Sequence, residues 1–205
     1  MKTLSLLMIN LILLSLFQIK AAGIEDVKAA DELVWFGIDY TKVQCIEDAE
    51  GSGFTNPNDI VNRMFQSWNG LFISEKDKYD LQGIFKKNEI KYNNESVNKL
   101  NSKVDPNQLV KKEASEFSED QLAGMIKKYD SGGNSGIGLV FIAETLNKAT
   151  EKGSYHLVFF DIESRKILFS KKMQGDAGGF GFRNYWAKSF YLVLDDAEKQ
   201  YKKKW

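Results

Sequence analysis

A glycine-rich segment near the carboxyl end, Gly175 to Gly181, contains the residues best suited to bind a ligand. Its glycines leave backbone N–H groups uncovered, and a helix is expected to begin just after it. Such N–H groups, a helix amino terminus and a guanidinium can together hold an anion. The spacing matches neither the P-loop nor the dinucleotide-binding fingerprint. We therefore expect either a simple chain reversal or, as the alternative, a ligand site that uses Gly178, Gly179, Gly181, Arg183 and Asn184.

The single histidine, His156, is the residue most able to act as a general base or as a ligand. It lies in a strand-like run with Val158 and Phe160 on its face, so a buried structural histidine is the competing interpretation. The sequence contains no zinc-ligand spacing and no serine–histidine–aspartate order. It therefore predicts no metal site and no cofactor. His156 is a functional residue only in the alternative hypothesis, in which a hydrolase or ligand-binding protein uses segment 175–186 together with His156.

The only cysteine, Cys45, lies in the strand-like run KVQCI and cannot form an internal disulfide. Free cysteines are usually buried. A nucleophilic thiol would also need a base beside it, and His156 is the one histidine available. We expect a buried, unreactive thiol and a fold that depends on its hydrophobic core alone.

The first 23 residues have the features of a secretory signal peptide. Lys2 supplies a positive charge, Leu4 to Ile19 is nearly all apolar, and Ala21-Ala22-Gly23 offers small residues for cleavage. The apolar run is short for a membrane-spanning helix, and an uncleaved anchor is the competing interpretation. The sequence thus predicts a signal peptide at 1–23 and one exported domain, periplasmic or extracellular, at 24–205.

The composition is that of an ordinary globular protein. Of the 205 residues, 43% are hydrophobic, and 28 basic residues balance 28 acidic ones. A net charge of zero argues against a general binder of nucleic acid. No transmembrane segment is expected after signal cleavage, and lysines along the last predicted strand favour a monomer.

Three consecutive strands between Ile137 and Met173 form the centre of the predicted fold. Short connections predict that they form an antiparallel meander. Leu33 to Tyr40 is apolar on both faces, which is typical of a strand inside a covered sheet. Helices are expected to begin at Asn56-Pro57 and near Arg183, the second running to the carboxyl end. The predicted class is α+β, with a mainly antiparallel sheet packed by several helices, including a long C-terminal helix.

An early apolar strand, VWFGIDY, precedes a helix. Later, a strand pair has the turn Asp161-Ile162-Glu163-Ser164-Arg165-Lys166-Ile167 before a glycine-containing link and a last helix. This order of elements resembles the α+β domain shared by the amino-terminal part of the periplasmic protein TolB and the curli-secretion lipoproteins related to CsgG. The chain differs by lacking the lipid-anchoring cysteine. The resemblance implies a non-catalytic module of the bacterial envelope and transfers no functional residue.

The leading hypothesis is therefore an exported, non-catalytic interaction module that contacts an envelope protein or a surface polymer. The alternative is a protein that binds a small molecule or anion, or a hydrolase, through the glycine-rich segment and His156.

Overall fold

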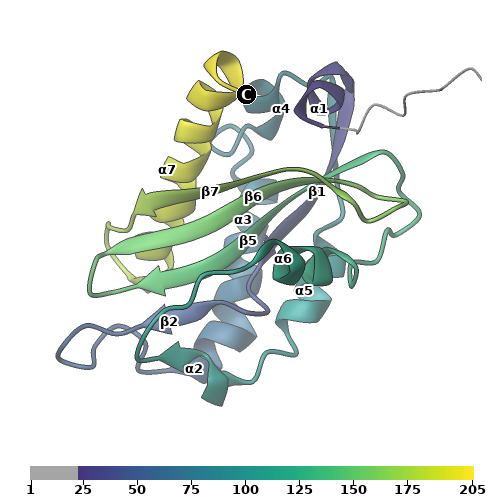
Figure 1. The fold of residues 1–205 in the computed structure, drawn as a ribbon. Helices are drawn as coiled ribbons and strands as arrows, with labels where there is room; N and C mark the ends of the chain where they lie inside the picture. Colours follow the sequence, from purple (N-terminus) through teal and green to yellow (C-terminus); the bar gives the residue numbers. More distant parts are fainter. Residues whose placement is uncertain (1–22) are drawn as a thin grey trace, which may run out of the picture.

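The computed structural model describes residues 23–205, so the expected signal peptide lies outside the described residues except for Gly23. One seven-stranded sheet organises this part of the chain (Figure 1). Its strands are β1 (Glu32–Asp39), β2 (Gln44–Ile46), β3 (Glu89–Tyr92), β4 (Val110–Lys111), β5 (Ile137–Asn147), β6 (Lys152–Asp161) and β7 (Ile167–Asp176). β5 is central: β1 and β2 pair with successive stretches of one edge, and β6 pairs with the other.

The expectation of a mainly antiparallel sheet is wrong. Four of the six strand pairings are parallel, namely β1–β3, β1–β5, β2–β4 and β2–β5. The predicted meander of β5, β6 and β7 is confirmed as antiparallel. The physical reason is that short loops reveal antiparallel neighbours in a sequence. Parallel neighbours are joined by long crossovers, which leave no local signal of the pairing.

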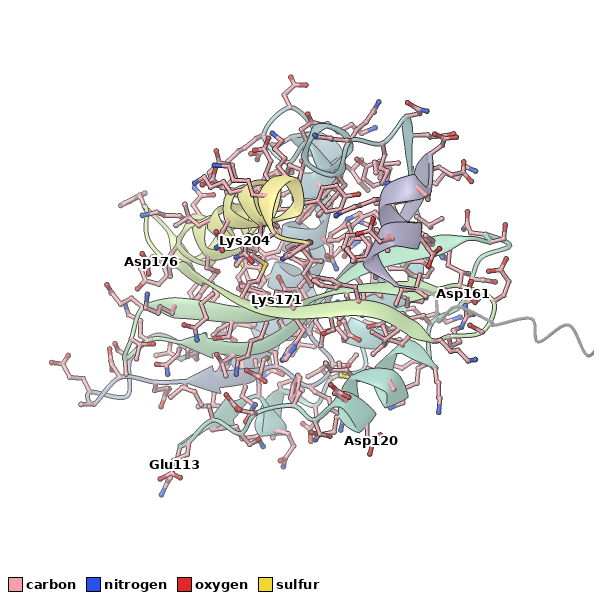
Figure 2. All side chains as sticks on the ribbon, turned by 45° about the horizontal axis from the view of Figure 1, so that its top comes forward. Glu113, Asp120, Asp161, Lys171, Asp176 and Lys204 are labelled. Atoms are coloured by element: carbon pink, nitrogen blue, oxygen red, sulfur yellow. The ribbon has the colours of Figure 1, made fainter. Side chains whose placement is uncertain are left out.

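Helices cover both faces of the sheet. One face carries α1 (Ile24–Ala29), α2 (Pro57–Asp59), η1 (Ile60–Met64), α3 (Phe65–Ser74), α4 (Leu81–Phe85) and α7 (Phe182–Lys203). The other carries α5 (Asn94–Asn101) and α6 (Glu119–Ile126), and a 3-10 turn, η2 (Pro106–Gln108), precedes β4. In Figure 1, α6 lies in front of the sheet and α3 behind it. Figure 2 shows the sheet between α7, with Lys204 after its end, and α6, with Asp120.

The helix that begins at Asn56-Pro57 starts as the sequence predicts. The Asn56 side chain accepts a hydrogen bond from the Asp59 amide at 3.1 Å, and Pro57 is the first helical residue. The helix continues through a π-helical turn, η1, into α3. Trp68 on α3 donates its Nε1–H to the Arg183 carbonyl at 2.9 Å and so ties this helix to the start of α7.

The link between β7 and α7 is shorter than the glycine pattern suggests. Gly175 lies inside β7, opposite Gly153 of β6. The connection itself is Ala177–Gly181, here called the elbow, in which Gly178, Gly179 and Gly181 all have positive φ. That conformation favours glycine because it has no Cβ. No helix within residues 23–205 is long and apolar enough to cross a membrane.

Candidate functional site

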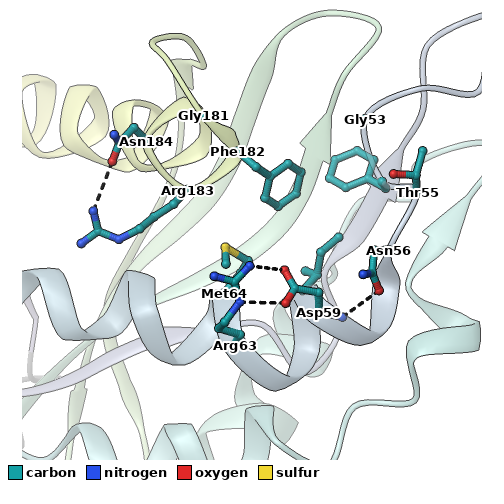
Figure 3. Close-up of a pocket in the computed structure, with 12 residues that line it drawn as sticks. Gly53, Thr55, Asn56, Asp59, Arg63, Met64, Gly181, Phe182, Arg183 and Asn184 are labelled. Carbon is teal, nitrogen blue, oxygen red and sulfur yellow. Dashed lines mark hydrogen bonds and ion pairs between the residues drawn. The ribbon is translucent and has the colours of Figure 1, made fainter.

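A groove opens where the elbow meets the start of the α2–η1–α3 helix. It has a volume of about 480 Å³, within the range of ligand and partner pockets. Four apolar side chains contributed by three segments of the chain line it: Phe54, Ile60, Met64 and Phe182. Phe54 and Phe182 pack edge to face, with ring centroids 6.1 Å apart. We call this space the elbow groove (Figure 3).

Polar side chains form the rim of the elbow groove. On the helix side, Asp59 accepts two hydrogen bonds of 2.8 Å from the guanidinium of Arg63. On the elbow side, Arg183 donates to the side-chain oxygen of Asn184 at 3.2 Å (Figure 3). An apolar floor within a polar rim is the usual anatomy of a protein-binding hot spot.

The wall formed by η1 departs from regular helix geometry. Ile60, Arg63 and Met64 belong to the π-helical turn and line the groove. Single π-helical turns within α-helices occur frequently at functional sites, because widening the turn redirects side chains. The turn therefore supports a functional interpretation of the groove, independently of its volume.

The structure brings together part of the site predicted from the sequence. Gly181, Arg183 and Asn184 line the elbow groove. Gly179 lines a smaller pocket of about 260 Å³ that shares Gly181 and Phe182 with the groove. The Gly178 amide donates to the Tyr185 carbonyl at 2.9 Å, so it is engaged within the elbow.

The guanidinium of Arg183 is held by the protein itself. Its Nε–H donates to the Ser67 hydroxyl at 2.9 Å, and one terminal nitrogen lies 3.7 Å from a Glu75 oxygen. With a third contact to Asn184, the guanidinium braces α7 against α3. This arrangement favours a structural role in shaping the groove over capture of a free anion.

Phe180, which the sequence analysis did not single out, is the most exposed large apolar residue of residues 23–205. Its side chain is 96% exposed at the tip of the elbow. The run Gly-Gly-Phe-Gly is the signal that could have identified it, because glycines on both sides leave the ring without neighbours to cover it. Gly181, the next residue, lines the groove, so Phe180 stands at the edge of the same surface.

His156 does not lie near the elbow. It lies on the sheet face covered by α5 and α6, whereas Trp186 and Phe182 of α7 pack on the opposite face. Its Nε2 lies 3.0 Å from Glu144 Oε1 on β5, and its ring stacks on Phe117, with centroids 6.0 Å apart. The alternative that combined His156 with the glycine-rich segment therefore has no geometric basis.

Glu144 is the centre of a second polar arrangement. Its carboxylate, 2% exposed, receives hydrogen bonds from His156, from the Phe117 amide at 2.8 Å and from Lys172 Nζ at 2.6 Å. Burial by itself raises the pKa of Glu144, but the hydrogen bonds from His156, Lys172 and Phe117 outweigh it and lower the pKa to about 2. Glu144 is therefore ionised throughout the physiological range.

Residues 112–118, here called the strap, run beside this carboxylate between β4 and α6. Gln44 of β2 exchanges hydrogen bonds with the Ser115 backbone at 2.7 and 2.8 Å. Glu116 pairs with Lys172 of β7 at 2.8 Å. The strap is thus attached to side chains of four strands, β2, β5, β6 and β7.

Cys45 behaves as expected. It is fully buried in β2, and burial raises the pKa of its thiol well above the usual range. A thiol with a raised pKa is a poor nucleophile. Among residues 23–205 there is also no group of three or more potential ligands that could hold a metal ion.

No protein-family model matches the chain, and its sequence matches no curated protein.

Proposed function

We propose that this protein is an exported interaction module that binds a partner polypeptide through the elbow surface, defined as Phe180, the elbow groove and its rim. The observation that carries the proposal is the exposed Phe180 ring at the edge of an apolar groove of about 480 Å³. A soluble domain gains nothing in its own stability from such a ring, whereas a partner that covers it gains apolar burial.

The residue types and the rigidity of this surface suit a protein partner. Aromatic and arginine side chains are enriched among the residues that dominate binding energy, and the elbow surface offers Phe180, Phe182, Arg63 and Arg183. The groove walls belong to α7 and the α2–η1–α3 helix, which are fixed to each other by the Trp68–Arg183 hydrogen bond. A preformed site requires little ordering on binding.

Export and the envelope setting are part of the proposal and rest on the sequence. The apolar segment near the amino terminus has the pattern of a signal peptide. The topological resemblance to TolB and the CsgG-related lipoproteins supports an envelope partner. A surface polymer is the other partner class considered, and the apolar floor of the groove favours a polypeptide over it.

The test is a selection of random displayed peptides against residues 24–205. We expect enriched peptides to share an aromatic or large aliphatic residue that enters the groove. Their affinity should fall about 30-fold or more in Phe180→Ala and in Thr55→Trp, as for a binding hot spot. Thr55 is an exposed residue of the groove lining, so a tryptophan there fills the space without disturbing the core.

Two controls separate loss of contact from loss of folding. Tyr191→Ala and Ile73→Ala truncate other exposed apolar residues that do not line the groove, and they should leave peptide affinity unchanged. Phe180→Ala should keep the melting temperature of the wild type. Selected peptides whose binding is indifferent to both elbow-surface variants would refute the proposal.

A small apolar molecule is the second candidate for the groove, since the volume also suits such a ligand. The same variants distinguish the two. A small ligand held in the groove should be sensitive to Thr55→Trp and indifferent to Phe180→Ala, because the Phe180 side chain does not line the groove.

A further inference from the structure

On the sheet face under α5 and α6, the side chains are apolar at one end of the strands and polar at the other. On β6, the residues of this face are apolar at Val158 and Phe160, which α6 covers, and polar at His156, Ser154 and Lys152. Several polar residues are nevertheless buried at this polar end, namely Gln44, Glu144, Thr145, Ser154 and His156. Burying polar groups is costly unless they are hydrogen-bonded, so such a concentration calls for an explanation.

A β-bulge aims two of these residues to the same side. Ala143 pairs with Tyr155 and Thr145 with Ser154, which leaves Glu144 as the extra residue in β5. As a result, Glu144 and Thr145 both face the polar end, and Leu146 returns to the opposite core. Bulges are frequent next to binding sites, where they redirect a side chain.

A pocket of about 400 Å³ lies at this polar end, between the strap and the sheet. We call it the polar pocket. Its lining residues include Ser115, Thr145 and Ser154, which have hydroxyl groups, together with Gln174, Glu144 and Lys172. Ala114 is its one apolar lining residue, and the other lining side chains have hydroxyl, amide or charged groups.

The charges around the polar pocket argue against an ionic ligand. Lys172 is already shared between the carboxylates of Glu144 and Glu116, and Lys152 is paired with Asp176. An anion would meet Glu144, which lines the pocket and is ionised at neutral pH. A cation would compete with Lys172 for the same carboxylate. A neutral ligand with many hydroxyl groups has neither conflict and can both donate and accept hydrogen bonds.

We propose that the polar pocket binds a neutral saccharide unit, with sugar hydroxyls hydrogen-bonded to Lys172 and Thr145. The Lys172 ammonium has three N–H donors and directs two of them to Glu144 and Glu116, so the third can donate a charge-assisted hydrogen bond to a sugar hydroxyl. The site is separate from the elbow surface, which packs on the other face of the sheet. The saccharide proposal can therefore be tested separately from the proposed protein partner.

The experiment is a titration of isotope-labelled residues 24–205 with glucose and with N-acetylglucosamine, followed by amide NMR shifts. A single sugar in such a site is expected to bind with a Kd on the order of 1 mM. The shifts should be concentrated in the strap, around the bulge in β5 and at the adjoining ends of β6 and β7. Thr145→Val, which removes a hydroxyl and keeps the side-chain shape, should weaken binding about fivefold or more.

The matched control is Thr55→Val, the same change in the elbow groove, which should leave sugar affinity unchanged. Glucuronate and inorganic phosphate serve as anionic probes and should bind more weakly than the neutral sugars. The proposal is overturned if neither neutral sugar shifts these amides at about 50 mM, well above the expected Kd. It is also overturned if the anionic probes bind more tightly, or if Thr145→Val has no effect.

Discussion

At the scale of single residues, Glu144 has the least ordinary environment in the part of the chain that the structure describes. A buried carboxylate is destabilising unless hydrogen bonds and opposite charge compensate for lost hydration. Here Lys172, His156 and the Phe117 amide supply that compensation from β7, β6 and the strap. One side chain thus links three segments, and its protonation should weaken all of these contacts together.

Glu144 should make the protein sensitive to acid. Its pKa in the folded state is lowered from 4.5 to about 2, so the stabilisation is fully present above about pH 4.5 and is lost as the pH falls toward 2. We expect the free energy of unfolding to fall by about 2–3 kcal/mol across this range from this residue alone. Chemical denaturation at a series of pH values measures it.

The variant Glu144→Gln tests the assignment of this acid sensitivity. It should be less stable than the wild type at pH 7 and should show a flatter dependence on pH below 4.5. Glu151→Gln removes an exposed carboxylate that also forms hydrogen bonds, and it should leave the pH dependence nearly unchanged. An equally steep acid dependence in Glu144→Gln would show that other carboxyls are responsible.

At the scale of elements, the docking of α7 on β6 and β7 depends on glycines at the contact. A Cβ on Gly175 of β7 would overlap with the backbone carbonyl of Ser189 in α7. A Cβ on Gly153, opposite it on β6, would lie 2.5 Å from the hydroxyl oxygen of Ser189. The helix therefore approaches the sheet more closely than side chains would allow. The glycine-rich pattern thus serves helix packing at Gly175 and chain reversal at Gly178 to Gly181.

Gly175→Ala should destabilise the protein by about 3 kcal/mol, because a backbone atom cannot move aside as a flexible side chain can. The matched control is Gly124→Ala, inside α6, where an added Cβ meets no atom within 4 Å. That change should stabilise the protein by about 0.5–1 kcal/mol through helix propensity. Thermal unfolding of both variants measures the contrast. Equal effects would contradict the close approach of α7.

The scale of elements is also where the sequence was most informative. The spacing of apolar residues and the cap at Asn56-Pro57 predicted the helix from residue 57, and the three-strand meander appears as predicted. The π-helical turn and the two-residue strand β4 had no local signal, because each depends on contacts with distant segments.

At the scale of the whole molecule, the described residues form one sheet with an apolar core on each face. The larger core draws side chains from β1, α3 and α7, including the buried Trp35, Trp68 and Trp186. The smaller core packs α5 and α6 against the same strands. Because both cores share β1, β5 and β6, neither can be lost without exposing the other.

We therefore expect residues 24–205 to unfold in one cooperative transition. Far-UV circular dichroism reports the helices, and tryptophan fluorescence reports the larger core, since three tryptophans are buried there. The two signals should give the same midpoint in urea. Midpoints that differ beyond experimental error would show that parts of the domain unfold separately.

What the sequence determined by itself is the identity of most elements and the mixed α and β class, because caps, turn residues and apolar periodicity act over a few neighbouring residues. Only the tertiary structure decided the direction of the strand pairings. β1 and β2 meet β5 across long connections whose geometry no local pattern encodes.

The same distinction holds for the candidate sites. The sequence singled out Gly181, Arg183 and Asn184, which line the elbow groove, but only the fold placed them opposite Asp59, Arg63 and Met64. His156 was noticed as a lone histidine, and its connection to Glu144 and Lys172 emerged only from the register of three strands. Side chains that act together are brought together by packing, and packing depends on residues that are distant in the chain.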